Sequence, residues 1–161
     1  MALYLFAGLA LATDGNFYGT AVDLNGEESG TIFQFTPGGA LTTLYTFKSG
    51  IGPAYGPFGP LIQGTDGNFY GTTSVGGNDN GGTVYSFSMC LGPFIKTLPK
   101  AGGAGEAVTI LGTNLTGATR VTFNGTESAF TVNSSGSEIS TTVPAGATSG
   151  KVRVTTPGAP W

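Results

Sequence analysis

The chain contains no histidine, a single cysteine and few charged residues, which make up 9% of its 161 residues. Without histidine there is no Ser-His-Asp set, no Cys/His metal cluster and no base that could convert Cys90 into a reactive thiolate. One cysteine also excludes an intrachain disulfide. We therefore interpret Cys90 as a small, half-buried apolar residue and not as a nucleophile or an intermolecular bridge.

Positive charge and long apolar runs are also scarce. The six basic residues are scattered along the sequence, and the net charge is −3. No basic patch could follow a phosphate backbone, so we expect no nucleic-acid partner. The apolar run Met1–Ala12 is too short to cross a membrane, so no membrane insertion is expected. It resembles a secretion signal without the positive n-region, or a pair of strands in the repeat described next, and we prefer the strands.

Glycine, by contrast, is abundant, with 29 residues, and much of the remainder is Thr, Ser, Val, Phe and Tyr. No window shows apolar residues at the spacing of an amphipathic helix. This composition is typical of short strands joined by tight glycine turns. With 39% hydrophobic residues, the sequence predicts a packed all-β chain.

An internal repeat organises the first half. The phrase TDGNFYGT occurs at Thr13–Thr20 and again at Thr65–Thr72, an offset of 52 residues. This period is typical of repeat architectures. Asp-Gly-Asn marks a tight hairpin turn in each unit. We predict strands at Gly8–Ala12, Phe17–Val22, Thr31–Thr36 and Leu41–Phe47 in the first unit, and at Pro60–Gly64, Phe69–Val75 and Thr83–Ser88 in the second.

One further strand is predicted at Ala2–Phe6, because its Leu-Tyr-x-Phe pattern matches Leu44–Phe47. The second unit lacks a fourth strand. We therefore expect Ala2–Phe6 to close the second unit within its own chain or to donate to the same place in a neighbour. Fewer than two complete units leave open sheet edges and apolar faces, so we expect a homo-oligomer.

The pattern changes after a Pro-bracketed boundary, which divides the chain into residues 1–90 and 91–161. Five alternating segments separated by Gly, Asn and Ser turns indicate a β-sandwich. They are Ala107–Gly112, Arg120–Asn124, Ala129–Asn133, Glu138–Val143 and Gly150–Thr155.

Both halves resemble known families. The DGxFYGT phrase, the Gly-Gly loop and the Gly-Thr-Val/Ile-Tyr/Phe strand resemble the GloVer-type tandem repeat of bacterial surface and secreted proteins. This resemblance implies propeller-like, four-stranded units. Residues 92–161 resemble the immunoglobulin-like IPT/TIG domain through Val108–Leu115, Gly117–Gly125, Val143–Gly146 and Gly150–Val154. Such domains usually add a strand after Thr156-Pro157-Gly158, where this chain is near its end.

Carboxylates are the candidate catalytic and metal-binding groups. Asp14, Asp66, Glu27 and Glu28 could hydrolyse a glycoside as paired acid and nucleophile. For Asp14 and Asp66 we favour a structural role, because Asp opens a turn by bonding its own backbone and because the residue recurs once per repeat. Oxygen ligands at Asp23, Asn25, Glu27 and Asp79 suggest a calcium site, but no full ligand motif is present and we favour polar turns.

Aromatic residues are the candidate ligand-binding groups. The Phe-Tyr pairs Phe17-Tyr18 and Phe69-Tyr70 place one ring on each face of a strand. Such rings could stack on sugars, or they could pack one ring inside each unit and one between units, which we favour. No other cofactor is indicated.

These observations favour a non-catalytic structural, adhesion or binding module, and the resemblances imply an extracellular or cell-surface location. Two alternatives are a carbohydrate-binding accessory of a secreted enzyme, which would have a polysaccharide partner, and a small carboxylate-dependent glycoside hydrolase.

Overall fold

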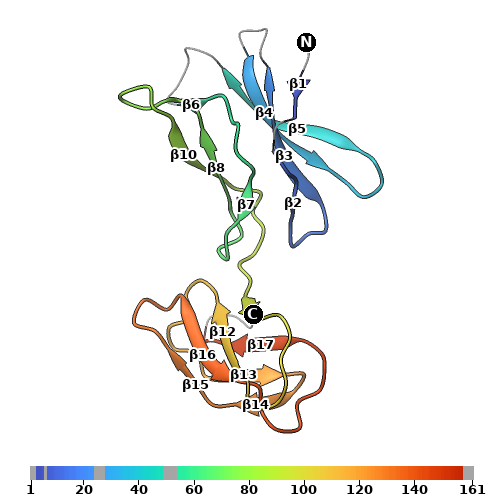
Figure 1. The fold of residues 1–161 in the computed structure, drawn as a ribbon, viewed down its shortest axis with the longest axis vertical. Coiled ribbons are helices and arrows are strands. Elements are labelled where there is room, and N and C mark those ends of the chain that lie inside the picture. The colour runs from blue at the N-terminus through green and yellow to red at the C-terminus, as the bar shows by residue number, and fades with distance from the viewer. Residues whose placement is uncertain (1–2, 6, 24–27, 49–53, 158–161) are drawn as a thin grey trace. The chain divides into compact units, whose positions relative to one another are not determined.

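The computed structural model describes residues 3–5, 7–23, 28–48 and 54–157. They form strands β1 to β17 and, within these ranges, no helix, so the predicted all-β class is confirmed. No helix in the described part of the chain is long and apolar enough to cross a membrane. The chain divides into two compact units, Met1–Leu91 and Gly92–Trp161 (Figure 1).

The first repeat is one antiparallel sheet (Figure 1). Strand β3 pairs on one side with β4, which pairs in turn with β5. On its other side β3 pairs with two short strands in succession, β2 and β1. The strands are β1 (Leu3–Tyr4), β2 (Ala10–Leu11), β3 (Phe17–Asp23), β4 (Glu28–Phe35) and β5 (Leu41–Lys48).

The second repeat reproduces the pairing of β2, β3 and β4 with the same register, as β7, β8 and β10, and none of its described strands corresponds to β5. The pair Tyr18↔Gln34 recurs as Tyr70↔Ser86. The sheet edge Ala10↔Tyr18 recurs as Ile62↔Tyr70. The sequence period is therefore also a period of strand pairing. The strands are β6 (Ala54–Tyr55), β7 (Ile62–Gln63), β8 (Phe69–Thr73), β9 (Val75–Gly76) and β10 (Thr83–Phe87).

The placement predicted for Ala2–Phe6 is wrong. Leu3 and Tyr4 pair with Asp23 and Val22 in the first repeat, not with the second repeat. Their counterpart is the pairing of Tyr55 with Val75, not the fourth strand β5. The Leu-Tyr-x-Phe pattern fits any half-buried strand, so the pattern alone could not identify its neighbour.

The two repeats share one hydrophobic core. The first repeat contributes Tyr18, Ile32 and Phe47, and the second contributes Leu61 and Phe69. The rings of Tyr18 and Phe69 lie 4.3 Å apart, and those of Phe47 and Tyr85 lie 5.2 Å apart. Because side chains alternate along a strand, each sheet has one face in this core and one face turned away from it.

The second unit is a sandwich of two antiparallel sheets (Figure 1). One sheet has the order β11-β12-β16-β15 and the other has the order β14-β13-β17. The strands are β11 (Lys96–Leu98), β12 (Ala107–Leu111), β13 (Arg120–Phe123), β14 (Thr126–Ser128), β15 (Phe130–Val132), β16 (Glu138–Thr142) and β17 (Val152–Thr155).

The sandwich core follows from the period-two pattern of the sequence. Val108 and Ile110 of β12, Ile139 of β16, and Val121 and Val154 of the other sheet are all buried in one cluster. All five predicted strands are present. Strands β11 and β14 were not predicted, because three-residue strands are too short for a periodic pattern to show.

Candidate functional site

Asp14 and Asp66 occupy equivalent hairpin turns that close in the same way. Gly15 donates its N–H to the Ala12 carbonyl at 3.0 Å, and Gly67 repeats this contact with Gly64 at 3.0 Å. The φ values of Gly15 and Gly67 are 82° and 90°, a region that favours glycine. The Asp-Gly-Asn phrase therefore forms the same turn twice.

Each aspartate then accepts three hydrogen bonds from its own hairpin. Asp14 accepts from the backbone N–H of Asn16 at 3.1 Å, its side-chain amide at 2.8 Å and the Tyr18 hydroxyl at 2.8 Å. Asp66 accepts the equivalent bonds from Asn68 at 3.1 and 2.9 Å and from the Tyr70 hydroxyl at 2.6 Å. The tyrosine thus ties the turn to the returning strand.

These contacts set the charge state of the turn. Burial raises the pKa of Asp14, but the hydrogen bonds from Asn16 and Tyr18 outweigh it, and the net pKa lies below its usual value. At Asp66 the Tyr70 hydroxyl is the main cause of a lowered pKa. The pKa of Tyr70 is raised, mainly by the same bond, and the pKa of Tyr18 is raised mainly by burial.

The arrangement at each turn suits structural support better than acid catalysis. A general acid for glycoside hydrolysis needs a raised pKa, whereas both aspartates shift downward. Glu27 lies outside the described residues, and for Glu28 the structure describes only the backbone, which pairs with Lys48. The geometry therefore agrees with the turn interpretation of Asp14 and Asp66.

The candidate calcium ligands are not brought together by any described contact. Asn25 and Glu27 lie outside the described residues, and Asp23 is described only as the end of β3, without its side chain. Asp79 is exposed in the turn between β9 and β10. Within the described ranges, no group of three acidic, cysteine or histidine side chains could hold a metal.

The four candidate aromatic residues have different environments. Tyr18 and Phe69 are completely buried against each other between the repeats, so their faces are covered by protein. Phe17 is half-buried and lies 6.4 Å from Phe35, ring to ring. Tyr70 is also half-buried, and its hydroxyl is bound to Asp66. At Tyr18 and Phe69, packing between the repeats is the role that the structure shows.

Cys90 is exposed, which corrects the expectation of a half-buried residue. It follows β10 in a stretch that forms no strand. Its backbone N–H donates to the Ser88 hydroxyl at 3.3 Å, and its φ is 56°.

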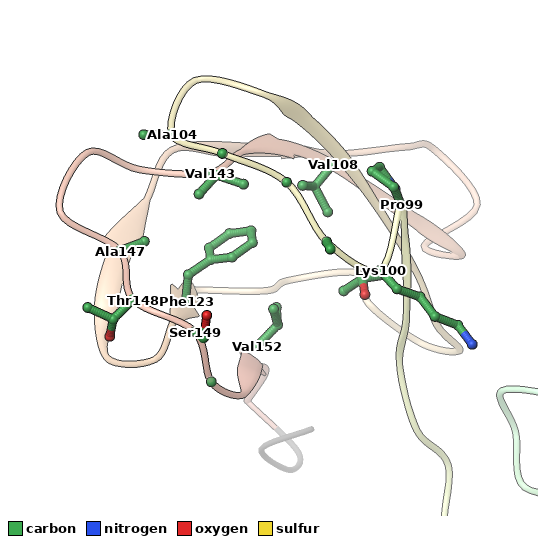
Figure 2. Close-up of a pocket in the computed structure, with 15 residues that line it drawn as sticks. Pro99, Lys100, Ala104, Val108, Phe123, Val143, Ala147, Thr148, Ser149 and Val152 are labelled. Atoms are coloured by element: carbon green, nitrogen blue, oxygen red, sulfur yellow. The ribbon is translucent and has the colours of Figure 1, made fainter.

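A cavity of about 300 Å³ opens at one end of the sandwich (Figure 2). Phe123 projects into it, and Val108, Val143 and Val152 complete an apolar wall. Polar atoms lie at the margin, on residues such as Thr148 and Ser149, and the Lys100 side chain extends outward from it. The exposed lining is thus about evenly divided between polar and apolar atoms, so the hollow offers an apolar wall beside hydrogen-bonding groups.

A cationic cleft of about 480 Å³ adjoins this cavity between β11 and β17, the edge strands of the two sheets. Lys100, Lys151 and Arg153 line it together with Ile95 and Thr97. The basic residues are therefore not all scattered, because three of the six meet here. Sequence reasoning missed this cleft because Lys100 and Lys151 are far apart in the chain and only the sandwich brings them together.

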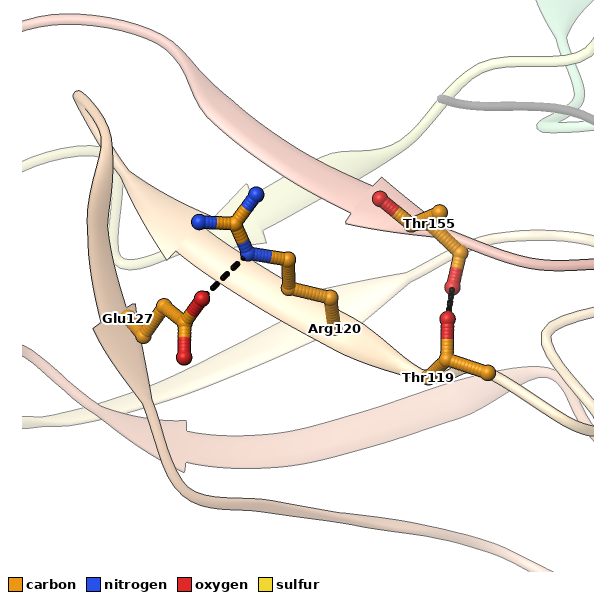
Figure 3. Close-up of polar contacts among 4 residues, drawn as sticks. All are labelled: Thr119, Arg120, Glu127 and Thr155. Carbon is orange, nitrogen blue, oxygen red and sulfur yellow. Dashed lines mark hydrogen bonds and ion pairs between the residues drawn. The ribbon is translucent and has the colours of Figure 1, made fainter.

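Arg120, by contrast, is neutralised by a neighbour. Its Nε lies 2.5 Å from a carboxylate oxygen of Glu127 across the β13–β14 pair (Figure 3). On the other side of β13, the Thr119 hydroxyl donates to the Thr155 carbonyl at 3.3 Å. Within the described part of the chain, Lys100, Lys151 and Arg153 form no such ion pair. Among the described residues, the cations of the cleft are therefore not neutralised by an ion pair, and Arg120, which is, serves as their control.

Comparison with known proteins identifies only the second unit. No curated protein sequence matches the chain, and no solved structure matches it. The paired sheets, the buried core between them and the Val108–Leu115 phrase all lie in one stretch. That stretch, residues 93–159, matches the family model of the IPT/TIG domain, so the second unit is an immunoglobulin-like IPT/TIG domain.

Proposed function

We propose that this chain is a non-catalytic extracellular module of the structural, adhesion or binding type. The observation that carries the proposal is the bonding of Asp14 and Asp66, since the best-placed carboxylates hold their own turns together. The IPT/TIG match supports it, because this immunoglobulin-like domain is non-catalytic and often serves adhesion or binding.

A glycan array combined with a hydrolysis assay on the same protein tests this proposal. We expect no turnover of any polysaccharide, whether or not it is bound. Turnover that disappears in Asp66→Asn while the fold is intact would contradict the proposal and favour the glycoside-hydrolase alternative. Asp14→Asn is the matched variant, because it changes the equivalent turn of the other repeat.

The second candidate function is carbohydrate binding, which the cationic cleft favours. Lys100, Lys151 and Arg153 present three positive charges beside a cavity with one apolar wall, and no acidic residue lines either hollow in the described structure. This combination suits an acidic polysaccharide, whose carboxylates would meet the cations while a sugar face lies on the apolar wall.

Charge removal distinguishes this binding mode from non-specific attraction. The double variant Lys151→Ala/Arg153→Ala should lose affinity for a uronic-acid polymer, whereas Arg120→Ala should keep it, because Arg120 is already paired with Glu127. Binding should weaken as salt is added, since exposed charges are screened. Equal affinity for a neutral glucan, or equal loss in both variants, would rule out the cleft as the site.

A further inference from the structure

The interface between the two repeats uses one face of each sheet. The forward face, defined by Tyr18, Thr20 and Ile32, is the face of the first repeat that meets the second. Tyr18 contacts Phe69 at 4.3 Å between ring centres, and the Thr20 hydroxyl donates to the Gly59 carbonyl at 3.0 Å. Because Thr20 pairs directly with Ile32, the two side chains lie on this same face.

The rear face, defined by Leu61, Gln63 and Phe69, is the face of the second repeat that meets the first. Gln63 accepts a hydrogen bond from the Thr13 backbone at 3.0 Å and donates one to the Thr13 hydroxyl at 3.1 Å. Leu61 and Phe69 belong to the shared core. The forward and rear faces are therefore complementary to each other.

The second repeat has its own forward face, and the first repeat has its own rear face, and neither of these is used in the interface between the repeats. On the forward face, Ile32 is 1% exposed, whereas its counterpart Val84 in the second repeat is 77% exposed. On the rear face, Leu61 is 3% exposed, whereas its counterpart Leu9 in the first repeat is 52% exposed. Leu11 is 64% exposed, and its counterpart Gln63 is buried. The outer faces thus expose apolar residues whose counterparts the inner interface buries, although Phe33, on the rear face of the first repeat, is itself covered at 8% exposed.

We propose that the chain associates head to tail, with the forward face of the second repeat in one copy packed on the rear face of the first repeat in the next copy. The occupant is a second copy because the exposed faces carry the same strands in the same register as an interface that the chain already forms. Burying Val84, Leu9 and Leu11 removes apolar surface from water, which drives the contact. This inference is independent of any ligand.

The contact between copies is smaller than the one within the chain. Within the chain, Phe47 of β5 contributes to the core between the repeats. The 52-residue register places its counterpart at Pro99, which lies in the sandwich unit, so the forward face of the second repeat has no equivalent of Phe47 to contribute. We therefore expect association that depends on concentration. A head-to-tail contact has no twofold axis and builds either a closed ring or a filament.

Sedimentation velocity under reducing conditions tests the inference, since a reductant excludes disulfides through exposed Cys90. Val84→Glu on the forward face, or Leu11→Glu on the rear face, should each raise the dissociation constant by at least about tenfold, because a carboxylate would be buried without a partner. Leu98→Glu, at a position 51% exposed on the sandwich, is the control and should leave association unchanged.

Mixing the two variants decides the orientation. A Val84→Glu copy keeps an intact rear face, and a Leu11→Glu copy keeps an intact forward face, so the mixture should form a dimer and nothing larger. A symmetric interface would give no such rescue and would overturn the proposal. A parent protein that stays monomeric up to submillimolar concentration would overturn it too.

Thermal unfolding of each variant checks that the variant is still folded. If Leu11→Glu does not fold, Leu9→Glu replaces it on the same face. A monomer that Val84→Glu strongly destabilises would show that the chain covers this face with its own residues, which would also refute the inference.

Discussion

Gly71 is the position at which the packing of the second repeat is easiest to disturb. It pairs across the sheet with Tyr85, whose ring lies over it. A Cβ atom at Gly71 would lie 2.6 Å from Cζ of Tyr85 and 3.0 Å from Cδ2 of Leu61. Leu61 is buried, and the Tyr85 ring packs on Phe47 at 5.2 Å. Gly71→Ala must therefore displace side chains that are held in the core.

The expected loss follows from two opposing effects. Overpacking a core typically costs about 1–3 kcal/mol. Replacing glycine by alanine returns about 0.4–1 kcal/mol by restricting the unfolded chain. We expect a net loss near 1–2 kcal/mol in the free energy of unfolding, on the order of the difference between those ranges. Gly71→Val should cost more, because its two methyl groups meet the same atoms.

Gly19→Ala is the matched variant in the first repeat. Its Cβ would lie 2.7 Å from Cζ of Phe33 and 2.8 Å from Cδ2 of Leu9. Phe33 is buried at 8% exposed, but Leu9 is 52% exposed and can move into solvent, which Leu61 cannot. The loss at Gly19 should therefore be smaller than the loss at Gly71.

Removing the Tyr85 hydroxyl should reduce the loss of stability that Gly71→Ala causes. This oxygen is buried and has no hydrogen-bond partner among the described residues. Tyr85→Phe alone should therefore stabilise the protein by about 1 kcal/mol. The hydroxyl is also the atom nearest to the Cβ that Gly71→Ala adds. The double variant Gly71→Ala/Tyr85→Phe should therefore be more stable than the sum of the two separate effects predicts, with a coupling free energy of about 1 kcal/mol. Phe33 already occupies the equivalent position in the first repeat.

Tyrosine fluorescence during urea unfolding measures these changes in the first unit alone. All six tyrosines precede residue 92, and the single tryptophan is Trp161. Equal stability of Gly71→Ala and the parent would refute the packing assigned to this strand. Additive effects in the double variant would show that the hydroxyl is not the obstacle.

Three further outcomes are expected. Raising the pH above 10 should destabilise the first unit, because burial raises the pKa of Tyr85 from 10.0 to about 12 in the folded protein. The stability held by the protonated phenol is then lost as the pH rises through the folded pKa. In pH-dependent unfolding, Tyr85→Phe should flatten this decline. Asp66→Asn should be less stable than the parent at neutral pH, and the two proteins should become equally stable in acid. The ionised Asp66 carboxylate stabilises the fold above its ordinary pKa of 3.8, and this contribution is lost as the pH falls through the lowered pKa of the folded state. In calorimetry of the sandwich, Ile139→Ala should lose about 2–5 kcal/mol as a core cavity, whereas Arg120→Ala should lose less than about 1 kcal/mol because its pair with Glu127 is exposed.

The sequence by itself determined the local structure. The Asp-Gly-Asn turns at Gly15 and Gly67 follow from residues that accept positive φ, and that requirement is local. The alternation of apolar residues predicted the sandwich strands, because a strand places every second side chain on the same face. The 52-residue period also predicted that both repeats would pair their strands alike, since equivalent residues have equivalent neighbours.

Only the tertiary structure decided which equivalent residues are buried. Ile32 and Val84 occupy the same place in their repeats, yet one is covered and the other is open, because a face is buried only by what lies against it. The neighbour of Leu3-Tyr4 and the meeting of Lys100 with Arg153 likewise depend on contacts between distant segments. Propensity and periodicity act along the chain, so they describe which surfaces can pack but not which surfaces meet.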